Sequence, residues 1–185
     1  EFSANTKSLT TAGALALALP SAEPAKAQSK EPIKIGFSMA LTGPLSPNGK
    51  QALLGLQIWE EEVNAKGGLL GRPIKLSYYD DQSQSAPVPG IYTKLLDVDK
   101  VDLVLGPYAT VPAAAAMPVV MQKNKMMIIL FGLGVNSEFK YDKFFAMIPS
   151  GPDPKPSFTT GFFEIAATQN PKPQTVAFIA ADQEF

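Results

Sequence analysis

Residues Ile33–Leu76 read IKIGFSMALTGPLSPNGKQALLGLQIWEEEVNAKGGLLGRPIKL, and this segment carries the clearest structural signal in the chain. A short apolar run opens it and ends at the turn Leu41–Pro44. An amphipathic segment follows, two glycines at Gly67 and Gly68 close it, and a second apolar run comes next. Strand, turn, helix, glycine stop and strand in this order are typical of a βαβ unit, so the two strands are predicted to lie parallel in one sheet.

The same alternation continues along the chain. Amphipathic segments over residues 48–66, 87–99 and 109–123 predict helices between apolar runs. The predicted strands are Ile33–Ala40, Ile74–Tyr79, Val101–Leu105, Met126–Phe131 and Phe144–Ile148. Five strands that alternate with helices over about 115 residues predict an α/β fold, a doubly wound parallel sheet lobe with enough residues for its own core.

Two of the predicted helices have distinctive local features. In the first, Asn48 or a neighbouring residue can cap the N-terminus, and Leu56, Trp59 and Val63 form an apolar stripe that we expect to pack on the sheet. The three glutamates at 60–62 are expected on the solvated side of that helix. In the third, Pro118 predicts a kink or a break.

Composition changes at both ends of this lobe. The proline-rich run Pro149–Pro156 predicts a stiff connector, followed by a helix over Ser157–Thr168 and a strand over Thr175–Ala180. We therefore divide the chain into residues 1–29, residues 30–149 as an N-terminal ligand-binding lobe, and residues 150–185 as a crossover and the start of a second lobe. A second lobe of only about 36 residues is too small to stand alone, so we expect the chain to be an incomplete N-terminal part of a longer protein.

Residues 1–29 resemble the remnant of a secretory signal peptide. Lys7 precedes the small apolar run Leu9–Leu19, and Ala25-Lys26-Ala27 offers an A-x-A cleavage pattern. The run is too short to span a membrane. Export to the periplasm is the prediction, and an Ala-rich tail without a targeting function is the alternative.

The composition excludes several classes of chemistry for these residues. The 185 residues are 45% hydrophobic and 18% charged, with a net charge of −1, which does not favour nucleic-acid binding. There is no cysteine and no histidine, so thiol catalysis, Ser-His-Asp triads and the usual zinc sites are excluded. We expect no enzyme, no cofactor and no metal.

The candidate site lies where open parallel sheets bind ligands, at the carboxyl ends of the strands. The turns to examine are 41–44, 108–110 and 132–136, because the free N–H groups and positive dipole end of a following helix can hold a carboxylate. Thr110 adds a hydroxyl. This combination suits an anionic or zwitterionic solute. Asp80 and Asp81 are either a catalytic or metal pair or, as we favour, solvated loop carboxylates that point apart.

Four blocks of sequence resemble one known family. They are LTGPL from Leu41, NAKGGLLGRPIKL from Asn64, the Asp80-Asp81 pair and VDLVLGPY from Val101. In this order they resemble the substrate-binding proteins of bacterial ABC importers in the branched-chain amino-acid group, over essentially all of residues 33–185. The resemblance implies a type I periplasmic binding fold, in which two α/β lobes close on a ligand, and an ABC permease in the inner membrane as partner.

The resemblance also implies ligand contacts. Tyr108–Thr110 matches the Ser/Thr-bearing loop that grips a ligand carboxylate, and Leu133–Val135 matches a second ligand loop but lacks its hydroxyl. Phe185 stands where the second lobe often supplies a stacking aromatic ring. With the first turn added, the candidate ligand-binding residues are Thr42, Tyr108, Ala109, Thr110, Leu133, Gly134, Val135 and Phe185.

These features together predict a solute-binding protein that captures a small carboxylate-bearing ligand, such as a branched-chain or related amino acid, and delivers it to a permease. An aromatic carboxylate or an amide is the alternative ligand. The alternative role is an extracellular sensor domain of a signalling receptor.

Overall fold

The structure, a computed structural model, describes residues 31–148, 154–177 and 179. The predicted signal segment 1–29, most of the connector Pro149–Pro156 and Phe185 lie outside the described residues. The elements in chain order are β1 (Ile33–Met39), α1 (Ser46–Ala65), β2 (Ile74–Asp80), α2 (Val88–Asp97), β3 (Leu103–Leu105), α3 (Thr110–Gln122), β4 (Met127–Ile129), α4 (Asn136–Phe139), β5 (Phe144–Ala146) and α5 (Pro154–Ala167).

The five strands form one parallel sheet in the order β2-β1-β3-β4-β5, which confirms the predicted α/β fold. Strand β1 pairs with β2 on one side and with β3 on the other, so the strand order reverses at β1. An open parallel sheet binds ligands beside such a reversal.

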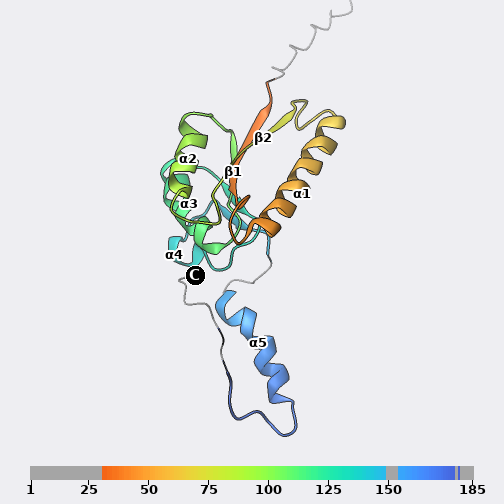
Figure 1. Ribbon diagram of the computed structural model, residues 1–185, viewed down its shortest axis with the longest axis vertical. Helices are drawn as coiled ribbons and strands as arrows, with labels where there is room; N and C mark the ends of the chain where they lie inside the picture. Colours follow the sequence, from red (N-terminus) through yellow and green to blue (C-terminus); the bar gives the residue numbers. More distant parts are fainter. Residues whose placement is uncertain (1–30, 149–153, 178, 180–185) are drawn as a thin grey trace, which may run out of the picture.

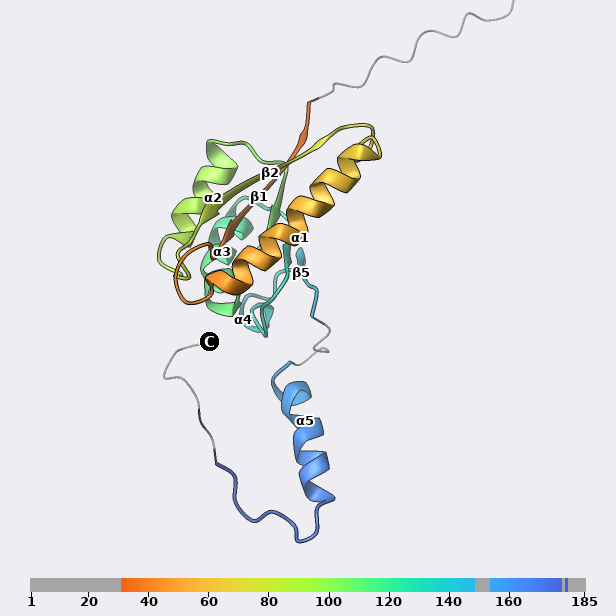
Figure 2. The same ribbon diagram turned by 45° about the vertical axis from the view of Figure 1, so that its right-hand side comes forward.

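Helices cover both faces of the sheet (Figures 1 and 2). On one face α1 packs on a cluster that includes Ile35, Phe37 and Leu76. On the other face α2 and α3 pack on a larger cluster. The alternation of strand side chains explains the division, because successive residues of a strand point to opposite faces. Gly36, between two residues of the first cluster, faces the second, where a Cβ would meet Val101 and Leu95.

Helix α1 differs from its prediction in three respects. It begins at Ser46 without a side-chain cap, and the Asn48 amide instead donates to the Tyr108 hydroxyl at 3.1 Å. Leu56 and Val63 pack on the sheet, but Trp59 remains 37% exposed at the flank of the helix. Glu60 is not on the solvated side, since its carboxylate accepts the Leu76 backbone N–H at 2.8 Å. The buried face therefore includes a polar position that a search for apolar periodicity does not detect.

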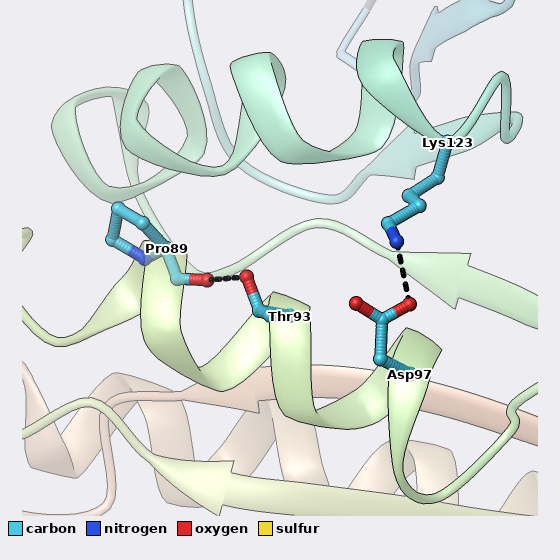
Figure 3. Close-up of polar contacts among 4 residues, drawn as sticks. All are labelled: Pro89, Thr93, Asp97 and Lys123. Carbon is cyan, nitrogen blue, oxygen red and sulfur yellow. Dashed lines mark hydrogen bonds and ion pairs between the residues drawn. The ribbon is translucent and has the colours of Figure 1, made fainter.

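Helices α2 and α3 lie side by side on the second face. Figure 3 shows the ammonium group of Lys123, the residue after α3, against the Asp97 carboxylate of α2, and the two atoms are 2.6 Å apart. In α2 the Thr93 hydroxyl donates to the Pro89 carbonyl at 2.8 Å. Helix α3 continues through Pro118, so the predicted break does not occur; the proline is exposed, where the missing backbone bond is least costly.

The segment after the lobe is only partly as predicted. Helix α5 corresponds to the predicted helix and stands apart from the lobe in both views (Figures 1 and 2). The predicted strand Thr175–Ala180 is wrong for the residues described, since 175–177 and 179 form no strand. An extended segment becomes a strand only when its backbone groups pair with a neighbour. Across residues 31–148, 154–177 and 179, no helix is both long and apolar enough to cross a membrane.

Candidate functional site

An open cleft of about 970 Å³ lies at the carboxyl edge of the sheet, where the sequence predicts a site. Four loops and one residue after β5 line it. The β1–α1 loop contributes Leu45, and the β2–α2 loop contributes residues 83–86. Residues 108–112 come from the β3–α3 loop and the first turn of α3. The loop after β4 contributes residues 131–133, and Ile148 lies just after β5. The cleft is thus built from loops that succeed neighbouring strands, at the point where the strand order reverses.

The N-terminus of α3 opens onto this cleft. Ala109 precedes the helix with φ 82° and ψ 162°, and its own N–H donates to the Phe131 carbonyl at 2.9 Å. The backbone N–H groups of Thr110 and Val111 have no acceptor among the described residues, as expected for the first turn of a helix. Both residues line the cleft. Two free donors and the positive end of the helix dipole favour an anionic group here.

The Thr110 hydroxyl joins two of the cleft loops. It accepts the Leu133 backbone N–H at 3.0 Å. An aromatic pair stands beside this contact, because the rings of Tyr108 and Phe131 pack with their centroids 5.1 Å apart and tilted by 42°. Phe131 is 47% exposed, so part of its ring is available to a ligand. The site therefore combines a helix N-terminus with free N–H donors and an apolar aromatic wall.

The structure brings together half of the predicted ligand-binding residues. Tyr108, Ala109, Thr110 and Leu133 line the cleft. The others lie elsewhere or outside the described part.

Three predicted residues lie in the described part but do not line the cleft. The Thr42 hydroxyl donates to the Asp80 carboxylate at 2.6 Å. The Gly134 carbonyl accepts the Ser137 N–H at 3.0 Å, and Val135 is buried in the core under α2 and α3. Phe185 lies outside the described residues.

Sequence reasoning missed the β2–α2 loop, residues 81–87, as a wall of the cleft. The sequence contained the information needed to find it, because this loop follows a predicted strand just as the other three loops of the cleft do. The sequence predicts that Asp80 and Asp81, where β2 passes into this loop, are solvated carboxylates that point apart, and this prediction is wrong for Asp81. Asp81 is fully buried, where its carboxylate accepts the Ser38 hydroxyl at 2.8 Å. Because β2 extends through Asp80, the next side chain points inward beside β1.

The pKa values of the two carboxyl groups are shifted in opposite directions. Burial raises the pKa of Asp81, and this effect outweighs the hydrogen bonds from Ser38 and Ser83 that lower it. Burial would also raise the pKa of Asp80, but hydrogen bonds from Thr42, Gln82 and Leu41 outweigh it and hold that pKa below its ordinary value. Asp80 is thus kept ionised as a hydrogen-bond acceptor. Within the described ranges, no group of three or more acidic side chains is placed to hold a metal ion.

A doubly wound parallel lobe with a helix N-terminus at its cleft is shared by proteins of many functions, so the family is identified by comparison with known proteins. The periplasmic binding protein family model matches residues 32–185, and the chain belongs to this family. A curated relative, the Leu/Ile/Val-binding protein BraC3 of Rhizobium johnstonii, is 32% identical over 99 residues, which cover 52% of this chain and 26% of that protein.

Two solved structures illustrate the likeness. The branched-chain amino acid transporter substrate binding protein LivJ of Streptococcus pneumoniae, in complex with isoleucine, superposes with a TM-score of 0.59 at 29% identity, over 63% of this chain and 33% of that one. A solute binding protein of an ABC transporter from Rhodopseudomonas palustris BisB5, in complex with 3,4-dihydroxy benzoic acid, superposes with a TM-score of 0.55 at 21% identity. The match covers 62% of this chain and 31% of that one, and at this identity it shows a likeness of fold alone. The chain spans about a quarter to a third of the length of these relatives.

Proposed function

We propose that this chain contains the N-terminal ligand-binding lobe, residues 30–149, and the start of the second lobe, residues 150–185, of an ABC-importer solute-binding protein. The protein captures a small carboxylate-bearing solute, a branched-chain or related amino acid, and passes it to a permease in the inner membrane. It carries out no catalytic step. The observation that supports this proposal most is the pair of free N–H groups at the start of α3, facing a cleft with an aromatic wall.

The ligand carboxylate binds to the N–H groups of Thr110 and Val111. Charge-assisted hydrogen bonds to backbone donors need no cationic side chain, and the α3 dipole adds to them. The Thr110 hydroxyl accepts a hydrogen bond from the Leu133 N–H and so holds the two loops together. The backbone N–H of Thr110 remains free to face the ligand. An aliphatic side chain then packs against Phe131 and Leu133, which are 47% and 37% exposed.

The names of the relatives support the amino-acid class. BraC3 is a Leu/Ile/Val-binding protein, and the LivJ structure holds isoleucine. A protein of this class works outside the inner membrane, which agrees with the leader-like residues 1–29 and their Ala25-Lys26-Ala27 pattern. We therefore propose export to the periplasm and delivery to an ABC permease.

A second candidate ligand is an aromatic carboxylate. The tilted Tyr108–Phe131 pair, with Phe131 partly exposed, offers a surface on which a third ring can stack. Such a ligand keeps its carboxylate at α3 and differs only in what covers the aromatic pair. An amide ligand, which has no negative charge, ranks below both because the helix dipole favours anions.

Two substitutions at one position test the proposal. Thr110→Pro removes the first free N–H of α3, where proline suits the first helical position, and also removes the hydroxyl. Thr110→Val removes only the hydroxyl and is the matched control. Titrations of the ¹⁵N-labelled 185-residue chain with L-leucine and with benzoate are followed by NMR. We expect Thr110→Pro to weaken binding about tenfold beyond Thr110→Val, since one charge-assisted hydrogen bond is lost.

The titration also separates the two ligand classes. Saturable shifts at the Val111 amide with leucine and none with benzoate support the amino acid, and the reverse supports the aromatic acid. If neither compound shifts the amides that line the cleft, or if both variants bind as the parent does, the cleft is not the carboxylate site.

A further inference from the structure

We infer that Asp80 is a positioning residue for the cleft, because its carboxylate fastens the β1–α1 loop, residues 40–45, to the β2–α2 loop, residues 81–87. Together these loops form one wall of the cleft, through Leu45 and residues 83–86. Asp80 itself does not line the cleft, so it acts through the loops it holds. The inference rests on the proposed function, since it takes the cleft to be the ligand site.

The Asp80 carboxylate accepts hydrogen bonds from both loops. Its Oδ1 accepts the backbone N–H groups of Leu41 at 2.9 Å and Thr42 at 3.2 Å, both in the β1–α1 loop. The same oxygen accepts the N–H of Gln82, in the β2–α2 loop, at 2.8 Å. Its Oδ2 accepts the Thr42 hydroxyl at 2.6 Å. One side chain therefore satisfies four donors. Among the described residues, the N–H groups of Leu41, Thr42 and Gln82 have no acceptor other than Asp80.

A second tie joins the same two loops. The Ser83 hydroxyl donates to the Thr42 carbonyl at 2.6 Å and accepts the Leu45 backbone N–H at 3.1 Å. Between the two ties the backbones are in contact, because a Cβ added to Gly43 would lie 2.5 Å from the Gln82 carbonyl oxygen. Gly43 also has φ +80°, which favours glycine. The loops thus form one hydrogen-bonded unit.

The β2–α2 loop depends on these bonds for its conformation. Gln82 and Ser83 both have positive φ, 58° and 61°, which is unfavourable for residues with a side chain. Their N–H groups are held by Asp80 Oδ1 and, at 3.1 Å, by Asp81 Oδ1. Asp81 is in turn fixed in the core by the Ser38 hydroxyl. When Asp80 no longer accepts, the loop is free to relax toward ordinary backbone angles, and the wall of the cleft moves with it.

The test compares two Asp→Asn variants of the 185-residue chain. Asp80→Asn keeps one acceptor oxygen but removes the charge and replaces the other oxygen, which accepts the Thr42 hydroxyl, with an NH2 donor, so every hydrogen bond that ties the loops is weakened or lost. Asp97→Asn is the matched control, because Asp97 pairs with Lys123 between α2 and α3 and does not line the cleft. For each variant, the dissociation constant for L-leucine is measured by NMR at a temperature well below its thermal unfolding midpoint, and that midpoint is measured separately.

We expect Asp80→Asn to raise the dissociation constant about three- to tenfold, because binding must then order a loop that the parent holds in advance. The amides of residues 82–86 shift even without leucine. Asp97→Asn keeps the parent dissociation constant although its unfolding midpoint falls. If both variants lose affinity in proportion to their unfolding midpoints, or if Asp80→Asn binds leucine as the parent does, the inference is overturned.

A further variant keeps the test decisive if Asp80→Asn does not fold. Thr42→Val removes the hydroxyl donor to Asp80 and keeps the charge, and Thr42 does not line the cleft. It is expected to weaken leucine binding in the same direction, by a smaller factor. If the parent chain shows no saturable shift at Thr110 and Val111, the proposed function fails. If the parent binds and neither Asp80→Asn nor Thr42→Val differs from it, only the positioning role fails.

Discussion

Asp80 and Asp81 are neighbours in sequence, but folding acts on their acidity in opposite directions. The folded state lowers the pKa of Asp80, so its ionised carboxylate contributes stability above the unfolded pKa, and this contribution is lost as the pH falls through the folded pKa. The folded state raises the pKa of Asp81, so ionised Asp81 opposes folding, and the native state gains stability from this group as the pH falls through its folded pKa.

The two Asp→Asn variants should therefore change the acid side of the stability curve in opposite ways. Urea unfolding of the parent, Asp80→Asn and Asp81→Asn chains between about pH 7 and pH 3 covers the range of carboxyl titration. Asp80→Asn is expected to lose stability at neutral pH and to show a shallower fall toward acid. Asp81→Asn is expected to show a steeper fall, because the compensating group is gone. Equal slopes for the two variants would contradict the assignment.

At the scale of single residues, the sequence predicted which residues lie at the cleft better than it predicted which polar residues are buried. Tyr108, Thr110 and Leu133 were predicted at the cleft because the turn after a parallel strand must lie at its carboxyl edge. The burial of Asp81 was not predicted, since it depends on the Ser38 hydroxyl of a neighbouring strand, 43 residues earlier in the chain. A polar residue becomes a core residue only when such a partner is supplied, and a linear pattern does not show the partner.

At the scale of elements, two glycines of α1 have opposite roles. Gly49 is buried, and a Cβ there would collide with the backbone carbonyl of Ala40, so the helix needs a glycine to approach the end of β1. Gly55 lies in the same helix with open space where a Cβ would be. The first glycine sets how closely α1 packs, whereas the second only weakens the helix.

Replacement of each glycine by alanine should thus have opposite effects on stability. Gly49→Ala is expected to destabilise the fold by about 1–3 kcal/mol through overpacking. Gly55→Ala is expected to stabilise it by about 0.5–1 kcal/mol through better helix propensity. Chemical denaturation of both variants measures the two free energies of unfolding. The close packing of α1 on β1 would be in doubt if Gly49→Ala were as stable as Gly55→Ala.

The elements themselves were largely predictable, because period-2 and period-3.6 patterns and glycine stops act locally. All five strands of the lobe and their parallel orientation follow from the alternation of strands and helices, whereas the order of the strands in the sheet was not predicted. The exceptions depend on tertiary partners. Trp59 fits the apolar period of α1 but lies at its flank, and Thr175–Ala180 fits a strand pattern but pairs with no strand among the described residues.

At the scale of the whole molecule, the cleft has walls on one side only. All of its lining residues lie between Leu45 and Ile148, within one lobe. A micromolar dissociation constant requires about −8 kcal/mol. Small-molecule sites reach such affinities by burying most of the ligand surface. The resemblance described above implies that a second lobe supplies the other part of that burial. An open wall buries one side of the ligand, so it gains a fraction of the contact energy but still loses the translational and rotational freedom of the ligand.

The 185-residue chain should therefore bind its solute weakly. Titration with L-leucine, followed by calorimetry and by the amide shifts of Thr110 and Val111, is expected to give a dissociation constant in the millimolar range, about −4 kcal/mol. Thr110→Pro serves as the control and is followed at the Val111 amide alone, because proline has no N–H at position 110. A weaker saturable shift of Val111 in that variant assigns the signal to the α3 N-terminus. A micromolar dissociation constant for the parent chain would contradict this expectation, since one lobe would then supply the whole binding energy and closure by a second lobe would not be needed for affinity.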